Sequence, residues 1–451
     1  MDNRPNIIFY FTDQQRADTC GCYGQKLDIT PNLDKMAEEG VKFEYAFSPQ
    51  PVCGPCRALF QTGKYPTDTG CFRNNIMLPS DIKTLANYIE EAGYETAYIG
   101  KWHLASDGEL EKPPTIDHTI TAIPKELRGG YTGFWRTADV LEFTSHGYDG
   151  YVFDENNNRI DFHGYRADCI TDLALDFFEE KTDKPFFMTI SHIEPHHQND
   201  HKHYEGPIGS KEKYKEYELP VDLKALDGDY REEYPDYLGA CASLDENLGK
   251  LINKLKEKGL YDNTVIIFAA DHGSHFRTRN RDNHLNGYDD YKRSCHDACL
   301  RVPLVIAGGP YKGGKVVEEL VSTESLPKTI LALAGVDVGD AMIGENLLDV
   351  VEKKNPERPN EVFAQISESR IGRTIRTAEY TYSVYAPGVN GGEAAAADVY
   401  ADDFLYDLTV DPHQLNNLIG NREYKEVKLE LRERLLNWIE KAEGKRPVIE
   451  D

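Results

Sequence analysis

Fully apolar stretches recur along this chain, and helical patterns separate them. Residues 6–12 read Asn-Ile-Ile-Phe-Tyr-Phe-Thr and contain no charged side chain. A strand of this composition has both faces buried, as in a parallel sheet covered by helices. Further strands are expected at 94–99, 186–191, 264–269 and 302–307, and helices at 30–40, 80–93, 166–180 and 232–257. This alternation predicts an α/β fold with a large mixed, mostly parallel sheet between helices.

The chain is too long for one ordinary domain. With 451 residues, a large core with a smaller unit beside it is expected. The pattern weakens over residues 105–165, which we interpret as an insertion near the active edge of the sheet. Residues 356–359 form a polar linker between a main domain at 1–355 and a C-terminal α+β subdomain at 360–451. The subdomain is expected to hold short strands near 362–367 and 373–385 and a helix at 424–441.

The chain is strongly acidic. It carries 51 basic and 77 acidic residues, for a formal net charge of −26. This charge argues against nucleic acid or an anionic membrane as a partner, because both would be repelled. A small anionic substrate would also be repelled at long range. Its site therefore requires a local cluster of cations that reverses the field inside one pocket.

Localisation is predicted from features that the chain lacks. No apolar stretch approaches the roughly 18 residues that a membrane span needs. The first residues show no charged-then-apolar leader, although a leader trimmed from the sequence would leave no trace. The nine cysteines are an odd number and are interpreted as mostly reduced thiols. A cytoplasmic location is therefore expected.

Polar side chains stand at the ends of two apolar strands. Asp13 and Gln14 follow the first strand, and Asp271 and His272 follow the strand at 264–269. Each aspartate taken alone is more often a helix cap or a turn residue. Two such pairs at the ligand-binding edge of an α/β sheet instead predict a site for one divalent cation. The oxygen ligands favour Ca²⁺, while His272 leaves Mg²⁺ or Mn²⁺ open.

A cysteine motif lies between these strands. Cys53-Gly-Pro-Cys56-Arg57 resembles the dithiol of thioredoxin-like redox proteins, in which a helix N-terminus stabilises a thiolate. The same residues, with Thr62-Gly63, also fit the pattern C-x-P-x-R-x-x-x-x-T-G, in which the first cysteine is converted to another side chain. The choice between these interpretations depends on what else surrounds Cys53.

Four basic residues could surround an anion. Lys101 and His103 are two residues apart just after a strand, so in extended backbone their side chains point to one side. His196 follows the strand at 186–191, and Lys292 precedes the strand at 302–307. Each residue taken alone is weak evidence for an anion site, because a lysine beside a turn is usually solvated and a lone histidine is usually structural.

Two further clusters of charged side chains allow more than one interpretation. Arg277, Arg279 and Arg281 form a charge run, which is most often a solvated loop. His197, His201 and His203 lie close to His196, so a histidine-rich zinc site is an alternative use of that segment.

Taken together, these motifs resemble the type I sulfatases of the alkaline phosphatase superfamily. The resemblance is collinear and covers nearly the whole chain. Its segments are residues 6–14, Thr30-Pro31-Asn32-Leu33-Asp34, Cys53 to Gly63, Gly100-Lys101-Trp102-His103-Leu104, Pro195-His196, Asp271-His272-Gly273, Lys292, Arg301-Val302-Pro303-Leu304, Leu405-Tyr406-Asp407-Leu408 and Asp411-Pro412. The family implies an alkaline-phosphatase-like fold and hydrolysis of a sulfate ester at the S–O bond.

The resemblance implies a modified nucleophile. Cys53 would be oxidised to formylglycine by a formylglycine-generating maturation enzyme, and its hydrate would attack sulfur. Asp13, Gln14, Cys53, Asp271 and His272 would bind the cation, with Asp271 also taking the proton of the nucleophile. Gln14 and His272 replace the Asp and Asn of many members, which could alter the preferred metal.

The remaining roles also follow from the resemblance. Arg57 would hold the hydrate, and Lys101, Lys292 and His196 would contact sulfate oxygens. His196 would protonate the departing alcohol. His103 would take the proton of the second hydroxyl as the sulfated hydrate collapses and releases sulfate.

Three functions are considered: a sulfatase first, then a phosphonate monoester hydrolase or phosphodiesterase of the same superfamily, then a CxxC redox protein. Cys56 departs from the usual Ser or Ala, and a disulfide with Cys53 would block maturation, so a reducing compartment is required. A sulfated carbohydrate is the expected substrate. Its pocket could be lined by Trp135, Tyr148, Tyr151, residues 277–281 and residues 197–203, or these could be ordinary loop residues.

Overall fold

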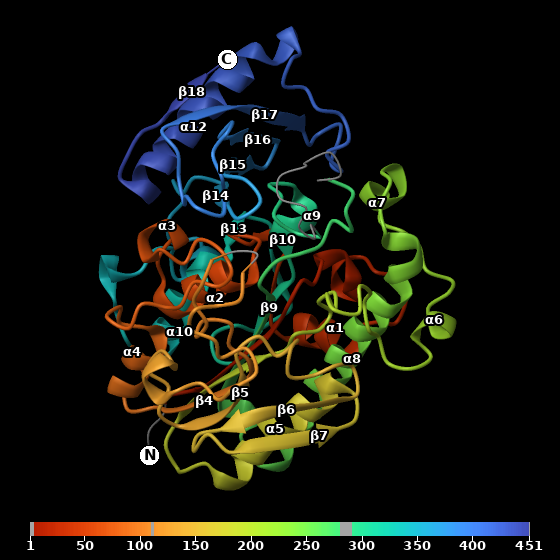
Figure 1. Ribbon diagram of the computed structural model, residues 1–451, viewed down its shortest axis with the longest axis vertical. Helices are drawn as coiled ribbons and strands as arrows, with labels where there is room; N and C mark the ends of the chain where they lie inside the picture. Colours follow the sequence, from red (N-terminus) through yellow and green to blue (C-terminus); the bar gives the residue numbers. More distant parts are fainter. Residues whose placement is uncertain (1–3, 110–111, 280–290, 451) are drawn as a thin grey trace.

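A ten-stranded sheet forms the centre of the computed structural model, which describes residues 4–109, 112–279 and 291–450 (Figure 1). Across the sheet the strands run β12 (Lys315–Val317), β2 (Val41–Phe43), β11 (Leu304–Ala307), β9 (Thr264–Ala270), β1 (Asn6–Thr12), β8 (Phe186–Ser191), β4 (Glu95–Lys101), β5 (Phe134–Ala138), β6 (Asp149–Asp154) and β7 (Arg159–His163). The five strands from β9 to β5 are parallel. The sheet is therefore mixed and mostly parallel, as predicted.

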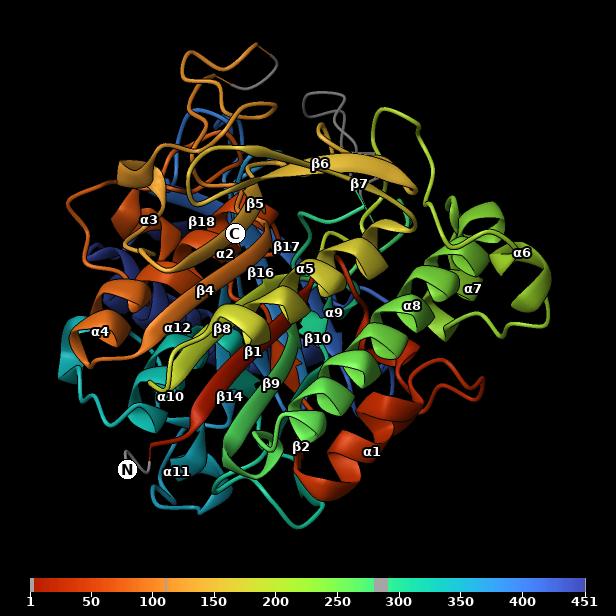
Figure 2. The ribbon, with the colours of Figure 1, turned by 90° about the horizontal axis from the view of Figure 1, so that it is seen from below.

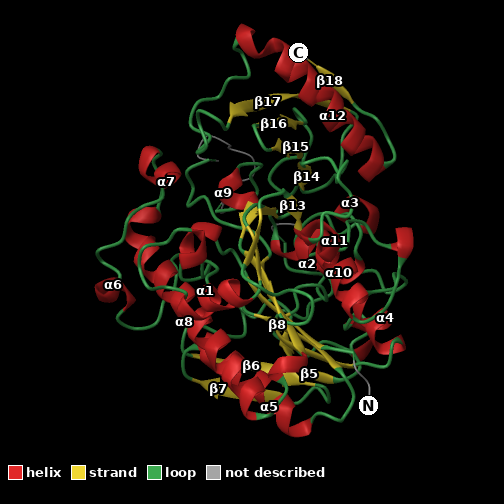
Figure 3. Ribbon diagram, turned by 180° about the vertical axis from the view of Figure 1, so that it is seen from behind, coloured by secondary structure: helices red, strands yellow, loops and turns green. Residues whose placement is uncertain are grey.

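Helices cover both faces of this sheet, as Figures 2 and 3 show. The α-helices among the described residues are α1 (Pro31–Glu39), α2 (Cys53–Thr62), α3 (Pro66–Thr69), α4 (Leu85–Glu91), α5 (Arg166–Glu180), α6 (Ser210–Lys213), α7 (Val221–Ala225), α8 (Tyr230–Glu257), α9 (Asp297–Leu300), α10 (Leu326–Leu333), α11 (Leu347–Val351) and α12 (Lys425–Glu443). In the view of Figure 2, α1, α5 and α8 lie along one face of the sheet.

Strand β1 shows why helices pack on both faces of the main sheet. Its residues alternate between two hydrophobic clusters: Phe9 and Phe11 pack on the side of α2 and α4, while Ile8 and Tyr10 pack on the side of α1, α5 and α8. Successive side chains of a strand point to opposite faces. Since all seven residues of β1 are buried, both faces are core, which is the reason that the strand reads as a continuous apolar run.

The segment at 105–165, interpreted as an insertion, contributes three strands to the main sheet. Strand β5 pairs with β4 in parallel, and the β6–β7 hairpin extends the sheet beyond it. These strands were not predicted because β5 is short and includes Arg136 and Thr137, both buried. Arg136 forms an ion pair with Glu155, a tertiary contact that the local sequence pattern does not predict.

The strand expected at 302–307 is divided in two. Pro303 separates β10 (Arg301–Val302) from β11, and β10 joins a small sheet with β3 (Ala46–Phe47) and β13 (Val321–Ser322). Proline has no N–H to donate to a ladder, so the chain changes sheets at this residue. Strand β11 then runs antiparallel to β9.

The C-terminal part forms a separate five-stranded sheet, at the top of Figure 1. Its strands run β14 (Glu361–Ile366), β15 (Gly372–Thr377), β16 (Tyr380–Tyr385), β17 (Val399–Asp407) and β18 (Val448–Glu450). The first four are antiparallel, and α12 contacts β15 and β16. The predicted antiparallel sheet and long helix are confirmed, whereas the division into domains at 1–355 and 360–451 stays a prediction.

A buried carboxyl group gives the fold a pH dependence. Burial raises the pKa of Glu324 to about 7, from a usual value of 4.5. The folded state thus holds a proton that the unfolded chain releases at lower pH, so this group lowers stability as pH rises from 4.5 to 7. Between pH 5 and 8, the free energy of unfolding of Glu324→Gln should rise by about 3 kcal/mol relative to wild type.

Urea denaturation at both pH values measures this difference. Glu318→Gln, at an exposed position, is the matched control and should follow the wild type at both pH values. Parallel curves for wild type and Glu324→Gln would show that the carboxyl group of Glu324 does not stay protonated in the folded chain.

Candidate active site

Cys53 begins α2, where the ends of two neighbouring strands meet. The register pairs Thr12 of β1 with Ala270 of β9, so the next residues, Asp13 and Asp271, emerge side by side. Asp13, Cys53, Asp271 and His272 are all fully buried, and one ligand atom of each lies within 4.8 Å of the others. The structure therefore brings together the residues that the sequence analysis placed at the strand ends and at the cysteine motif.

The Cys53 sulfur is surrounded by groups of both signs. Its Sγ lies 3.3 Å from Asp13 Oδ1, 3.4 Å from His272 Nε2 and 2.9 Å from Lys292 Nζ. Burial alone would raise the pKa of this thiol, but Lys101, Lys292 and His272 outweigh burial and hold the pKa well below its usual range. The position thus stabilises negative charge on the side chain of residue 53.

Arg57 and Lys101 bind the carboxylates from the other side. Arg57 lies 3.0 Å from Asp13 Oδ2 and 3.6 Å from Asp271 Oδ2, and Lys101 Nζ lies 2.7 Å from Asp13 Oδ2. Arg57 also donates to the Lys101 carbonyl at 2.8 Å and to Ser191 Oγ at 2.5 Å. These bonds to the ends of β4 and β8 fix the guanidinium, so its direction is set by the sheet.

The two carboxyl groups titrate differently. Burial and the Cys53 thiolate act to raise the pKa of Asp13, but Lys101, His196 and Arg57 lower it below its usual range. The pKa of Asp271 is instead raised, because its carboxylate is buried and faces Asp13. Of this pair, Asp13 is the fixed negative charge, and Asp271 is the group that can exchange a proton.

Gln14 is held in an unusual backbone conformation. Its φ is +71°, in the left-handed region that residues other than glycine rarely adopt, and its N–H donates to Asp271 Oδ1 at 3.1 Å. Its Nε2 donates to Tyr204 Oη at 2.8 Å and to Ser274 Oγ at 3.3 Å. Because both donor hydrogens of the amide face these hydroxyls, the amide group is oriented. Sequence analysis did not single out Tyr204 or Ser274.

His196 and Lys292 form a pair. Lys292 Nζ lies 2.7 Å from His196 Nε2, and an ammonium group can only donate. His196 therefore accepts at Nε2 and carries its proton on Nδ1, which faces Glu142 Oε2 at 4.0 Å. Burial, and then Lys292, lower the pKa of His196. Glu142 belongs to the segment in which no strand was predicted, and no sequence motif marks it.

The extended backbone expected between Lys101 and His103 was wrong, while their roles stay a prediction. Lys101 is the last residue of β4 rather than a residue beyond it, and His103 has φ of +61°, so the backbone between them is not extended. The His103 N–H donates to the Asp139 carbonyl at 2.6 Å, which fixes this turn. A hydrogen bond from His103 still reaches Cys53, where it helps to lower the pKa of the thiol.

The donor set fits a divalent cation. Among the described residues, the buried Oδ2 of Asp271 accepts no hydrogen bond and has Arg57 at 3.6 Å as its cationic neighbour. Two carboxylates and an oriented amide supply hard oxygen donors, and His272 Nε2 lies 3.5 Å from Asp13 Oδ1. A cation here would satisfy the Asp271 oxygen and relieve the repulsion between the two carboxylates.

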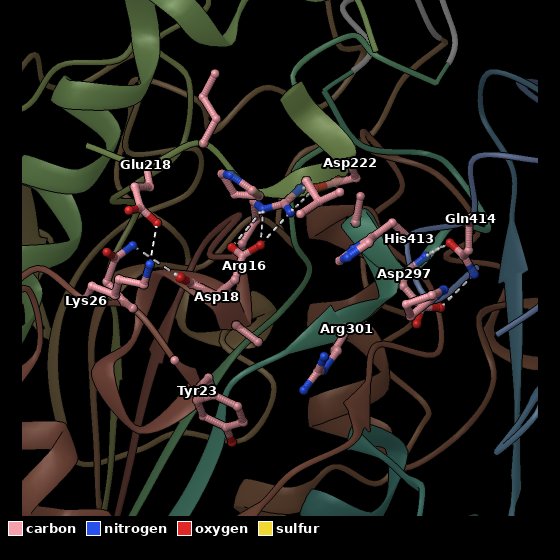
Figure 4. A pocket seen from close by; sticks show the side chains of 18 of the residues that line it. Arg16, Asp18, Tyr23, Lys26, Glu218, Asp222, Asp297, Arg301, His413 and Gln414 are labelled. Atoms are coloured by element: carbon pink, nitrogen blue, oxygen red, sulfur yellow. Dashed lines mark hydrogen bonds and ion pairs between the residues drawn. The ribbon is translucent and has the colours of Figure 1, made fainter. Parts of the chain in front are cut away.

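Two cavities flank the site. One, of about 320 Å³, is lined by Arg16, whose guanidinium pairs with Asp18 and Asp222 (Figure 4). Arg16 also donates to the Ser274 carbonyl at 2.8 Å, so this cavity lies behind the loop that follows β9. The other, of about 760 Å³, is lined by His197, Arg277 and Tyr291 among others, and thus adjoins His196 and Lys292 in the chain.

The residues predicted to line a carbohydrate pocket do not lie together in the structure. Trp135 is buried among Tyr98, Trp102 and Tyr131, and its assignment to a pocket was wrong because this aromatic cluster is core. Of the remaining predicted residues, His197, Asn199, Lys202 and Arg277 line the larger cavity and Arg279 lines the smaller one. Tyr148, Tyr151, His201 and His203 line neither, and Arg281 lies outside the described residues.

Comparison with known proteins decides the family. Residues 5–336 match the family described as Sulfatase. The chain belongs to the sulfatase family. Residues 286–441 of this sulfatase also match the region described as N-sulphoglucosamine sulphohydrolase, C-terminal. The chain is thus a sulfuric ester hydrolase, as predicted.

Individual relatives of this sulfatase support the family assignment. An Ulvan-active sulfatase from Formosa agariphila is 31% identical over 453 residues, covering 95% of this chain and 80% of the relative. An N-acetylglucosamine-6-O-sulfatase from Bacteroides thetaiotaomicron is 26% identical over 516 residues, covering 95% and 85%. The solved yidJ structure from Bacteroides fragilis shares the fold, with a TM-score of 0.81, 23% identity and coverage of 98% and 97%.

The predicted absence of a membrane span can be compared with the structure. None of the helices in the described part of this sulfatase combines the length and apolar character that crossing a bilayer requires.

Proposed function

We propose that this sulfatase hydrolyses sulfate monoesters of carbohydrates, with residue 53 acting as formylglycine and a bound Ca²⁺ beside it. The observation that carries the proposal is the position of the Cys53 side chain, between two carboxylates and three buried cations. The substrate class is supported by the names of the relatives, one active on ulvan and one an N-acetylglucosamine-6-O-sulfatase.

The cations around residue 53 suit an anionic substrate. Arg57, Lys101 and Lys292 lie in a protein whose net charge is −26, and all three are nearly fully buried. In a site shielded from water, fixed cations act far more strongly on a sulfate group than they would at the surface. They can therefore reverse the repulsive field of the protein inside this one pocket.

Each chain group has a proposed role. Cys53 Sγ marks the place of the formylglycine oxygens, which would supply an oxygen nucleophile. Arg57 orients that side chain, and Asp271 accepts its proton, in line with the raised pKa of the Asp271 carboxyl. Lys101 and Lys292 bind the sulfate oxygens. His103, hydrogen-bonded to residue 53, removes a proton from the same side chain when sulfate leaves.

The leaving alcohol requires a proton donor. His196 is the proposed donor, and its Nε2 lies 2.7 Å from the Lys292 ammonium. Because Nε2 accepts from Lys292 in the free site, the proton for the alcohol reaches this nitrogen from the Lys292 ammonium. His196 and Lys292 thus act as one proton-holding unit, which their shared hydrogen bond keeps aligned.

The cation would be held by Asp13, Gln14, Asp271 and His272, together with residue 53. When bound, it would stabilise negative charge that develops on the reacting oxygens. The oxygen-rich donor set favours Ca²⁺ over softer metals, and His272 is the ligand that leaves Mg²⁺ or Mn²⁺ open.

The sugar portion of the substrate has a cavity beside these groups. The cavity of about 760 Å³ is lined by His197 and Tyr291, next in sequence to His196 and Lys292. The Tyr291 and His197 rings, both nearly buried, stack 4.4 Å apart in its lining, and Arg277 lies over the Tyr291 ring. A lining that combines aromatic rings with polar neighbours is suited to a sugar, which has both apolar and hydroxylated faces.

A substrate panel tests the proposed function. Sulfated monosaccharides and oligosaccharides, aryl sulfates, phosphonate monoesters and phosphodiesters are compared by kcat/KM on one preparation, and mass spectrometry of the peptide spanning residues 51–63 reports conversion of Cys53. Sulfate release from sulfated sugars supports the proposal. A dominant phosphodiester rate would favour the phosphonate hydrolase alternative, and release from aryl sulfates alone would refute the carbohydrate substrate.

Metal removal should destabilise the protein measurably. Calcium at about 100 times its dissociation constant should add about 2.7 kcal/mol to the free energy of unfolding, and chelation should remove this increment. Asp271→Asn keeps the shape of the side chain but removes its charge, so calcium should stabilise this variant much less. Thermal unfolding with and without chelator measures both. Equal calcium responses in wild type and Asp271→Asn would place the ion elsewhere.

A further inference from the structure

Three histidines and two carboxylates gather on the surface away from Cys53. His146 lies in the loop between β5 and β6, and the other four lie in the loop between β8 and α6. We call His146, Asp200, His201, His203 and Glu205 the histidine cluster. The three histidines and Asp200 are exposed and Glu205 is half-buried. The proposed hydrolysis uses none of these five residues.

Within this cluster, His146, Asp200 and His201 bridge the two loops. His146 Nε2 lies 2.8 Å from Asp200 Oδ2, and the rings of His146 and His201 are stacked with centroids 4.2 Å apart and planes 11° from parallel. One ligand atom from each of the three residues lies within 4.8 Å of the others. Small side-chain rotations would therefore bring two imidazole nitrogens and one carboxylate oxygen onto a single ion.

The carboxylate is already oriented by its surroundings. Asp200 Oδ1 accepts from Gln198 Nε2 at 2.7 Å and from the His201 N–H at 3.1 Å, which leaves Oδ2 directed at His146. Gln198 Nε2 also donates to the Glu142 carbonyl at 3.2 Å, so Gln198 links the loop after β8 to the β5–β6 loop. Hydrogen bonds from surrounding groups regularly orient the side chains that bind a metal.

We propose that His146, Asp200 and His201 bind one Zn²⁺ ion, which clamps the β5–β6 loop to the loop after β8. Imidazole nitrogens suit zinc, and two histidines with a carboxylate leave a fourth position for water. The oxygen-rich set around Cys53 is suited to Ca²⁺, so the two sites differ in the metal they select. The clamped loops carry Glu142 and His196, whose facing atoms lie 4.0 Å apart.

A neighbouring set shares one of these ligands. His201, His203 and Glu205 also lie within 4.8 Å of one another, all on the same loop. An ion there would use His201 without joining the loops, so it would not act as a clamp. His197, which the sequence grouped with His201 and His203, is directed elsewhere: its Nδ1 lies 3.0 Å from Asn199 Oδ1 and its ring stacks on Tyr291.

Zinc titration of the untagged full-length protein, in excess Ca²⁺ to fill the site at Cys53, tests the clamp. Calorimetry should give one Zn²⁺ per chain for the wild type. His146→Ala and His201→Ala should weaken binding at least about tenfold. His203→Ala should bind within about threefold of wild type. Zinc should raise the Tm of wild type and His203→Ala but not that of His146→Ala.

The variants distinguish the outcomes because all three positions are exposed, and the zinc-free Tm of each variant is the baseline for its own zinc-dependent shift. Equal zinc affinity in wild type and His146→Ala would overturn the proposal. A loss in His203→Ala that exceeds the loss in His146→Ala would overturn it as well, since the ion would then be held by the set on one loop. Sulfate-ester hydrolysis in Ca²⁺ alone should be the same in all four proteins, which separates this test from that of the proposed function.

Discussion

Replacing Cys53 by alanine should lower kcat/KM for a sulfate ester by about 10⁴- to 10⁶-fold, the range seen when a nucleophile is deleted. Alanine leaves α2 its first residue and removes the sulfur atom that contacts Asp13, His272 and Lys292 at once. Fold and cation site should survive, so the loss is chemical. Sulfate release under saturating Ca²⁺ measures it, and calcium-dependent thermal stabilisation checks that the metal still binds.

Cys56 offers the matched control for this loss. Its Sγ donates to the Asp271 carbonyl at 3.2 Å, and burial raises the pKa of this thiol well above its usual range, so it remains protonated. Cys56→Ser keeps a donor at that place and should retain activity within about tenfold, with residue 53 still converted. A loss in Cys56→Ser as large as in Cys53→Ala would mean that the two cysteines act as a pair, contrary to the proposed function.

The fold and the centre of the site could be predicted from the sequence because both follow from local sequence patterns. A continuous apolar run predicts a strand buried on two faces, and parallel strands end at one edge. The register of β1 with β9 then brings Asp13 beside Asp271 without further information. Family resemblance supplied the remaining partners, Cys53, Lys101, His196 and Lys292.

Other features could not be predicted because they depend on contacts between distant segments. Glu142 faces His196 only after β5 and β6 have joined the sheet, and Tyr204 orients Gln14 across 190 positions of the chain. The left-handed turn at His103 depends on the Asp139 carbonyl, which lies beyond an adjacent strand. No periodicity or local propensity encodes such pairings.

Replacing Lys292 by methionine should lower kcat/KM by about 10²- to 10³-fold, the usual loss when one fixed group that stabilises developing charge is removed. Methionine has a similar length and no charge, so the loss isolates the ammonium that lies 2.9 Å from residue 53 and 2.7 Å from His196. The exposed Lys35→Met is the control for a lysine change without a role in the site, and its rate should equal that of wild type.

The pH profile of Lys292→Met distinguishes a catalytic cation from a structural one. Lys292 helps to lower the pKa of His196, so its removal should raise that pKa and move the corresponding limb of the kcat/KM profile to higher pH. A purely structural role would lower the rate equally at every pH and would also lower Tm. A rate within tenfold of wild type would mean that Lys101 suffices to bind the sulfate group.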